Sequence, residues 1–218
     1  MKKHIIRIAL IASILSVSVS CKKETAESNQ PKQTEQISDA TIYNLDKEQS
    51  NIDWRGYKIF KSQNTSHFGT MNFSEGEISV KNGAIVSGKF VADTKSLTNI
   101  DLADDKEASE KLNQHLKSVD FFDVEKYPTA VFELTKVTPT EQGDYNSTLE
   151  GNLTIKDQTK QVSFNANVKV TDEQITISTE PTDINRQDFN VNFLSPVENG
   201  ILKNEITLQI SVKANVKK

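Results

Sequence analysis

Alternation of apolar and polar residues dominates the chain after about residue 42. Every second residue is apolar or small from Tyr145 to Ile155, and the same pattern recurs in 162–170 and 206–216. A period of two is typical of β-strands that bury one face. Because a short polar turn joins the first two runs, they predict a β-hairpin.

Shorter segments with the same alternation predict further strands. They are residues 50–60, 67–73, 76–80, 84–92, 130–134, 175–177 and 189–193. Asn82-Gly83, between two of them, is the strongest short hairpin signal. These ten segments correspond to an expected eight or nine strands, and several exceed the usual length of about five or six residues. Long alternating strands favour a barrel over a small sandwich.

One segment departs from the period of two. From Asp104 to Lys117, apolar residues recur every four positions at Ala108, Leu112 and Leu116, with acidic residues early and basic residues late. This pattern predicts a single amphipathic helix whose charges suit its dipole. The fold class is therefore all-β, an antiparallel barrel that is closed or nearly closed, with the helix over an end or a side.

The N-terminal 20 residues have the pattern of a secretory signal, a basic MKKHIIR followed by an apolar stretch. This stretch is shorter than the roughly 20 apolar residues of a membrane span. Ser18-Val19-Ser20-Cys21 resembles a bacterial lipoprotein processing site, which predicts removal of residues 1–20 and lipidation of Cys21. We therefore expect an extracytoplasmic protein anchored in a membrane, on the periplasmic face or the cell surface of a bacterium.

Residues 21–41 contain almost no apolar side chains and are expected to form a flexible tether. Residues 42–218 then form one domain, since about 175 residues is a usual domain size. The net charge is −4, and removal of Lys2, Lys3 and Arg7 with the signal changes it to −7. Such an acidic chain is not expected to bind nucleic acid, and it repels anionic headgroups.

Catalytic motifs are absent from the sequence. It has no G-x-S-x-G, no H-E-x-x-H and no glycine-rich phosphate loop, and Cys21 is its only cysteine. We expect neither catalytic residues nor a metal site. An enzyme acting on a lipid-like substrate remains an alternative, but it requires His67, His115 and Arg186 to converge on one cavity.

The inward-facing residues are sufficient for a core but leave the state of the barrel interior open. An eight-stranded barrel is either packed by its own side chains or holds one small ligand. Small residues leave volume, or they mark bends and close approaches of the backbone. The small residues at inward positions are Gly56, Gly69, Gly88, Ser147, Gly151 and Ala166.

Two blocks of sequence carry a resemblance to a known family. HLKSVDFFDVEKYPTAVFEL (115–134) and GNLTIKDQTKQVSF (151–164) resemble the YceI-like, polyisoprenoid-binding family. Further matches are Trp54 with Gly56, His67 with Gly69, Gly88 with Phe90 and Asp93, and Ile184-Asn185-Arg186 with Phe189. The resemblance implies an eight-stranded lipocalin-like barrel whose apolar cavity takes an isoprenoid or another long amphiphile. It implies no catalytic residues and no cofactor apart from a bound isoprenoid lipid or quinone.

Nine residues are candidates for contact with such a ligand: Trp54, His67, Met71, Phe90, His115, Phe121, Phe122, Phe132 and Arg186. Phe121 and Phe122 either line the tunnel or pack the helix onto the barrel. Arg186 is the best candidate for a polar or anionic headgroup, although a surface ion pair with Asp183 or Asp188 is favoured slightly.

We therefore expect a membrane-anchored carrier that binds a lipid-like small molecule. The alternative from another class is a solid barrel that serves as a structural or interaction module at the cell envelope. The sequence does not determine the oligomeric state.

Overall fold

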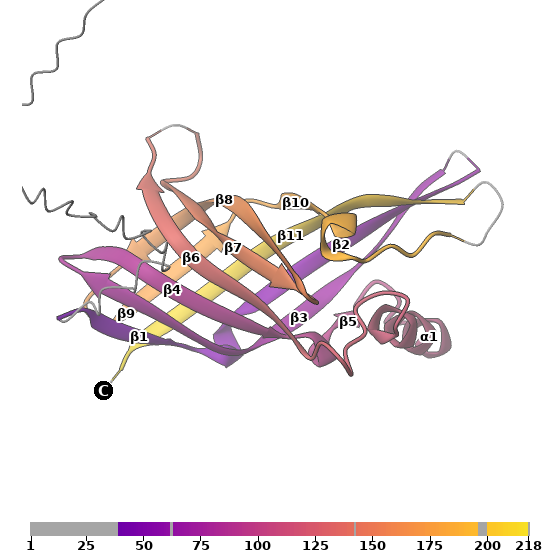
Figure 1. Cartoon of the computed structure of the whole chain (residues 1–218), viewed down its shortest axis with the longest axis horizontal. Helices are drawn as coiled ribbons and strands as arrows, with labels where there is room; N and C mark the ends of the chain where they lie inside the picture. Colours follow the sequence, from indigo (N-terminus) through magenta and orange to yellow (C-terminus); the bar gives the residue numbers. More distant parts are fainter. Residues whose placement is uncertain (1–38, 62, 142, 196–199, 218) are drawn as a thin grey trace, which may run out of the picture. The chain divides into compact units, whose positions relative to one another are not determined.

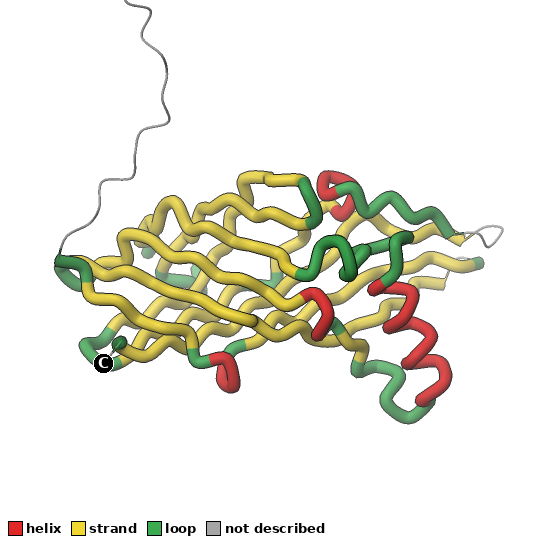
Figure 2. The backbone as a smooth tube through the Cα atoms, turned by 60° about the horizontal axis from the view of Figure 1, so that its bottom comes forward, coloured by secondary structure: helices red, strands yellow, loops and turns green. Residues whose placement is uncertain are grey.

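Eight antiparallel strands form a closed ring in the computed structural model, which describes residues 39–61, 63–141, 143–195 and 200–217 (Figures 1 and 2). The strands are β2 (Asn51–Phe60), β3 (Gln63–Lys81), β4 (Ala84–Asp93), β6 (Thr129–Pro139), β7 (Ser147–Ile155), β8 (Gln158–Val170), β9 (Gln174–Thr179) and β11 (Gly200–Val216). They pair in this order, and β9 closes the ring against β11 from Ser211↔Ser178 to Asn215↔Gln174. The expected eight-stranded antiparallel fold is confirmed.

Short elements decorate this ring. Three further strands pair with it: β1 (Thr41–Leu45) with β3 and β11, β5 (Thr98–Asn99) with β3, and β10 (Thr182–Asn185) with β11. The short 3-10 helices are η1 (Lys47–Gln49), η2 (Thr94–Ser96) and η3 (Arg186–Phe189). All these elements lie in the compact unit Ile37–Lys218, whereas the expected signal, Cys21 and most of the expected tether lie outside the described residues.

The expected helix is α1 (Lys106–Lys117), the only α-helix in the described residues. Asp105 is its N-cap, and the Asp105 carboxylate accepts a hydrogen bond from the Ala108 N–H at 3.0 Å. The capping carboxylate also suits the positive end of the helix dipole. None of the helices in this part of the chain is long and apolar enough to cross a membrane.

Two expectations about strands are wrong. Residues 67–73 and 76–80 belong to a single strand, β3, and a register shift between Phe73 and Glu75 absorbs the break in alternation. The strand expected at 189–193 does not form. Phe189 ends η3, and Asn190 has a φ of 58°, a left-handed conformation that interrupts an extended chain.

The two ends of the barrel differ. At one end a packed core fills the ring, with Tyr43 of β1 buried and its hydroxyl donating to the Thr171 carbonyl at 2.8 Å. At the other end β2, β3 and β11 continue past their other partners as a three-stranded extension, residues 57–61, 63–66 and 200–204, which we call the arm. The arm and α1 flank this open end in Figures 1 and 2.

Gly69 and Gly56 provide a matched test of this packing. A Cβ on Gly69 would lie 1.9 Å from the Thr98 carbonyl oxygen in β5, whereas one on Gly56 would meet nothing within 4 Å. We expect Gly69→Ala to lower the free energy of unfolding by about 1–3 kcal/mol, because β5 would have to move. Gly56→Ala should be neutral or slightly stabilising. Urea denaturation followed by circular dichroism measures both, and equal effects would contradict this packing.

Candidate functional site

An apolar cavity of about 1060 Å³ occupies the half of the barrel next to the open end. This volume is at the upper limit of the roughly 300–1,000 Å³ that is typical of ligand sites. Strand residues make its apolar wall, namely Ile52, Trp54, Met71, Phe73, Phe90, Ala92, Phe132, Leu149, Leu153, Phe164, Ile177, Leu208, Ile210 and Val212. The alternative of a solid barrel is therefore wrong, because these side chains enclose a cavity.

Three rings from separate segments meet at the open end. The Phe121 ring centroid lies 5.0 Å from that of His115 in α1 and 5.0 Å from that of Phe193, which follows η3. The His115 and Phe193 centroids are 4.6 Å apart. All three residues line the cavity, so we call this cluster the aromatic gate.

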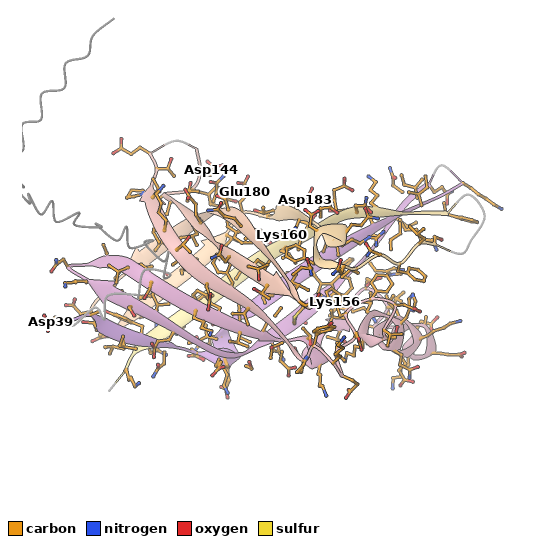
Figure 3. The ribbon with its side chains drawn as sticks, in the orientation of Figure 1. Asp39, Asp144, Lys156, Lys160, Glu180 and Asp183 are labelled. Carbon is orange, nitrogen blue, oxygen red and sulfur yellow. The ribbon has the colours of Figure 1, made fainter. Side chains whose placement is uncertain are left out.

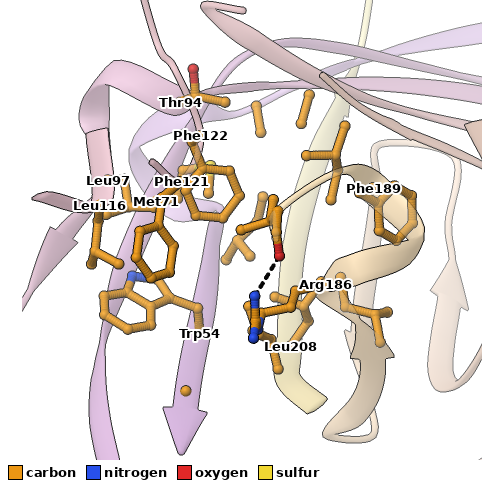
Figure 4. Close-up of a pocket in the computed structure, with 18 of the residues that line it drawn as sticks. Trp54, Met71, Thr94, Leu97, Leu116, Phe121, Phe122, Arg186, Phe189 and Leu208 are labelled. Carbon is orange, nitrogen blue, oxygen red and sulfur yellow. Dashed lines mark hydrogen bonds between the residues drawn. The ribbon is translucent and has the colours of Figure 1, made fainter. Parts of the chain in front are cut away.

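Phe121 and Phe122 have both of the roles that the sequence left open: they line the cavity and they pack the helix onto the barrel. Phe121 is 6% exposed and contacts α1 through His115. Phe122 packs against the two clusters of the hydrophobic core, and both rings border the cavity (Figure 4). The pair therefore lines the cavity and also attaches the helix to the barrel.

Lys156 holds the gate segments in place. Its ammonium donates hydrogen bonds to the carbonyl oxygens of Phe121 and Asn190, each at 3.1 Å. Lys156 lies in the tight turn between β7 and β8, with a φ of 56° (Figure 3). One cation thus joins the segment after α1 to the segment after η3.

All nine residues that the sequence singled out border this one cavity. Trp54, Met71, Phe90 and Phe132 project from four different strands and are buried or half-buried. Sequence reasoning did not select Phe193, Leu208 or Lys203 for the site, although they also line it. The alternation of Phe189, Val191 and Phe193 was the available signal for the gate, but it predicted a strand instead.

Arg186 is buried, so the surface ion pair that its sequence context favoured is wrong. It is 2% exposed and makes no ion pair with Asp183 or Asp188, which are both exposed (Figure 3 for Asp183). Its Nε donates to the Lys203 carbonyl at 3.1 Å and its Nη1 to the Val191 carbonyl (Figure 4). Burial lowers the pKa of the guanidinium from its ordinary value.

The guanidinium of Arg186 therefore joins η3, the segment after it and β11. Its Nη2 has no partner and almost no accessible surface, although other parts of the side chain border the cavity. A headgroup could contact Nη2 only after a local rearrangement. The geometry assigns Arg186 to the wall of the cavity.

His67 forms a separate polar site at the cavity border. Its Nδ1 lies 2.7 Å from a carboxylate oxygen of Asp101, whose other oxygen accepts the Phe68 N–H at 3.0 Å. In the neutral ring Nδ1–H is then the donor and Nε2 the acceptor. His67, His115 and Arg186 have different partners, and no hydrogen bond or ion pair joins any two of them in the described part of the chain.

Nothing in the described segments gathers three or more His, Cys, Asp or Glu side chains in a way that could hold a metal ion. Two His–Asp pairs lie at the cavity border, His67–Asp101 at 2.7 Å and His115–Asp120 at 3.7 Å, and in the described segments neither imidazole is hydrogen-bonded to a nucleophile. The arrangement can bury an apolar chain and offer a few polar contacts at its opening.

The small inward residues have different roles. Gly56 faces open space in the cavity. At Gly151 an added Cβ would lie 2.4 Å from an atom of the Phe132 ring. At Gly69 the backbone of β5 occupies the space of a Cβ. Only some of the small residues therefore leave volume, while others admit a ring or a neighbouring strand.

The fold and the site define a class, a closed antiparallel barrel with an apolar cavity open at one end. The model of the YceI-like domain matches residues 43–214, so the chain belongs to the YceI-like domain family. It is 34% identical over 117 residues to a UPF0312 protein of Vibrio cholerae, covering 53% of each chain. Over 135 residues it is 33% identical to a UPF0312 protein of Pseudomonas putida, covering 58% of this chain and 62% of the relative. The chain thus spans little more than half the length of these curated relatives.

Two solved structures have the same fold. BcnA of Burkholderia cenocepacia aligns with a TM-score of 0.60 at 20% identity, covering 78% of this chain and 98% of that chain. A polyisoprenoid binding domain from Saccharophagus degradans, implicated in plant cell wall breakdown, aligns with a TM-score of 0.52 at 12% identity. It covers 81% of this chain and 99% of that chain. At these identities the likeness shows the fold.

The role of Arg186 can be tested with a conservative variant. Arg186→Lys keeps the charge but cannot donate to both the Lys203 and the Val191 carbonyls in the same geometry. We expect it to lower the free energy of unfolding by about 2–3 kcal/mol, since a buried acceptor loses its donor. Asp188→Ala, at an exposed residue that only accepts from Asn185, is the control and should change little. A surface ion pair would instead make both changes similarly small.

Proposed function

We propose that this protein binds a long-chain amphiphilic lipid, such as an isoprenoid, in the barrel cavity and carries or sequesters it. The observation that carries this proposal is the vacant apolar interior of about 1060 Å³, open at one end. A solid scaffold would not keep such a space. The polyisoprenoid binding domain of similar fold supports the choice of an isoprenoid chain.

The driving force is removal of the chain from water. Each buried methylene contributes about 0.8 kcal/mol. Ten of them amount to about 8 kcal/mol before ordering costs, which corresponds to a dissociation constant near 1 μM. Because the wall is almost wholly apolar, affinity should depend on chain length more than on the headgroup.

Several polar residues of the cavity lie near its opening. Tyr57, Lys58 and Lys203 border it from the arm, and His67 and His115 border it beside α1. A tail held inside would therefore place its headgroup at the open end. An isoprenoid quinone fits this arrangement, because its ring carbonyls can accept hydrogen bonds there.

The same proposal includes cleavage of the N-terminal signal, lipidation of Cys21 and an extracytoplasmic location. Their support is the sequence of residues 1–21. Mass spectrometry of the protein from its native membrane would show a cleaved chain with acyl groups on Cys21. A full-length chain with a free thiol would refute the anchor and leave the binding proposal intact.

Bound lipid is tested directly by native mass spectrometry of protein purified without detergent. We expect an added mass of several hundred daltons, which should extract into organic solvent and can then be identified. A persistently unliganded mass, together with no uptake of added isoprenoid quinone or isoprenoid alcohol, would contradict a carrier function.

Gly56→Leu tests whether the cavity is the site. The new side chain points into open space, so we expect the fold to persist while the affinity for an isoprenoid alcohol falls about tenfold, because part of the volume is filled. Gly56→Ala is the matched control and should bind almost normally. Displacement of a fluorescent lipid probe measures both, and unchanged binding by Gly56→Leu would place the ligand elsewhere.

A further inference from the structure

We propose that the open end of the barrel docks on the surface of an anionic phospholipid bilayer, so that ligand passes between membrane and cavity without crossing water. This goes beyond lipid binding, since it assigns a second surface and a partner. It also differs from the lipid anchor, which belongs to residue 21.

Three exposed apolar side chains define the docking surface, which we call the rim. Val119 is 75% exposed, Leu194 71% and Ile201 59%. They come from three segments far apart in sequence: the turn after α1, the segment after η3, and the start of β11 in the arm. Large apolar side chains exposed to this degree at the border of a cavity are typical of an interaction surface.

Each rim residue is a sequence neighbour of residues that line the cavity. Val119 lies between Ser118 and Asp120, and both of these residues line the cavity. Leu194 has the same relation to Phe193 and Ser195, and Ile201 precedes the lining residue Leu202. Each rim residue therefore points outward directly beside an inward-facing one. Ile100 is also exposed, but it precedes the acidic residues at the start of α1 and is not included.

The charge of the arm supports an anionic partner. Its described residues include Lys58, Lys61 and Lys203 and no acidic residue, in a chain whose net charge is −4. Within the described part of the chain no carboxylate forms a salt bridge with these three lysines. The repulsion of anionic headgroups that the net charge predicts is therefore not expected at the arm.

The arrangement of these lysines favours a bilayer over a folded protein partner. Lys58 and Lys61 lie over the Phe60 ring, 5.9 and 5.2 Å from its centroid, and Lys203 lies 5.8 Å from the Tyr57 centroid. Rings and aliphatic side chains beside lysines are typical of interfacial segments, where the apolar part enters the acyl boundary and the ammonium meets phosphate. The proposed ligand is itself dissolved in that phase.

The position of the rim can be measured with a dye on single cysteines. Val119→Cys, Leu194→Cys and Ile201→Cys are made in the full chain, labelled with an environment-sensitive dye and added to vesicles of phosphatidylcholine and phosphatidylglycerol. The vesicles also contain a spin-labelled lipid that quenches embedded dye. The unsubstituted chain, treated with the same dye, reports any label on Cys21.

Val86→Cys is the matched control. Val86 is also apolar and exposed, at 38%, but it lies in β4 near the closed end of the barrel. We expect quenching at the three rim positions and little at Val86. Quenching at Val86 alone, or at none of the four positions, would overturn the proposal.

Lys61→Glu tests the charge, since Lys61 is exposed and does not line the cavity. We expect the rate of transfer of a fluorescent isoprenoid between anionic vesicles to fall about tenfold, because two units of charge change near the surface. Lys160→Glu, on the outer wall in β8, should change the rate little (Figure 3). Transfer that is equally fast for both would contradict docking.

A separate measurement distinguishes docking from the proposed function. Displacement of a fluorescent lipid probe in solution reports ligand binding without a membrane. If Lys61→Glu binds the probe normally but transfers slowly, the substitution impairs docking and leaves ligand binding intact, which is the expected result. If the parent chain binds no probe, the carrier function is refuted, and the quenching experiment still decides whether the rim meets a bilayer.

Discussion

Closure of the eight-stranded ring is the constraint on which the rest of the structure depends. Pairing of β9 with β11 fixes the circumference, so the volume inside is set by the strands and only then divided among side chains. At the closed end Tyr43 and its neighbours fill that volume. Towards the open end Gly56 faces space that no side chain enters. One wall thus forms both a core and a cavity.

Most strands of the ring could be predicted from local sequence patterns. The hairpin at Asn82-Gly83 has φ values of 53° and 76°, as the turn chemistry predicted, and the alternation of 145–155 and 162–170 gave β7 and β8. The short strands β1 and β5 were not predicted. β5 has only two residues and β1 (TIYNL) does not alternate strictly, so no period of two marks them.

The sequence predicted many of the residues that border the cavity, but it did not predict what each of them does. The nine candidates do border one cavity, since inward position follows from alternation and from family resemblance. The structural role of Arg186 was not predicted, because its burial and its hydrogen bonds to the Lys203 and Val191 carbonyls arise only from the tertiary fold. The alternation of residues 189–193 predicted a strand that contains Phe193. In the structure this segment pairs with no strand, and the left-handed Asn190 interrupts it.

The two ends of the barrel also constrain how an anchored protein could reach a membrane. β11 runs from the arm to the closed end over 17 residues, or about 55 Å, and β1 begins at Thr41 beside its C-terminal end. The segment from Cys21 to Thr41 can span at most about 70 Å. With the proposed anchor at Cys21, the chain is long enough for the rim to meet the anchoring bilayer. An upright barrel would use most of that length.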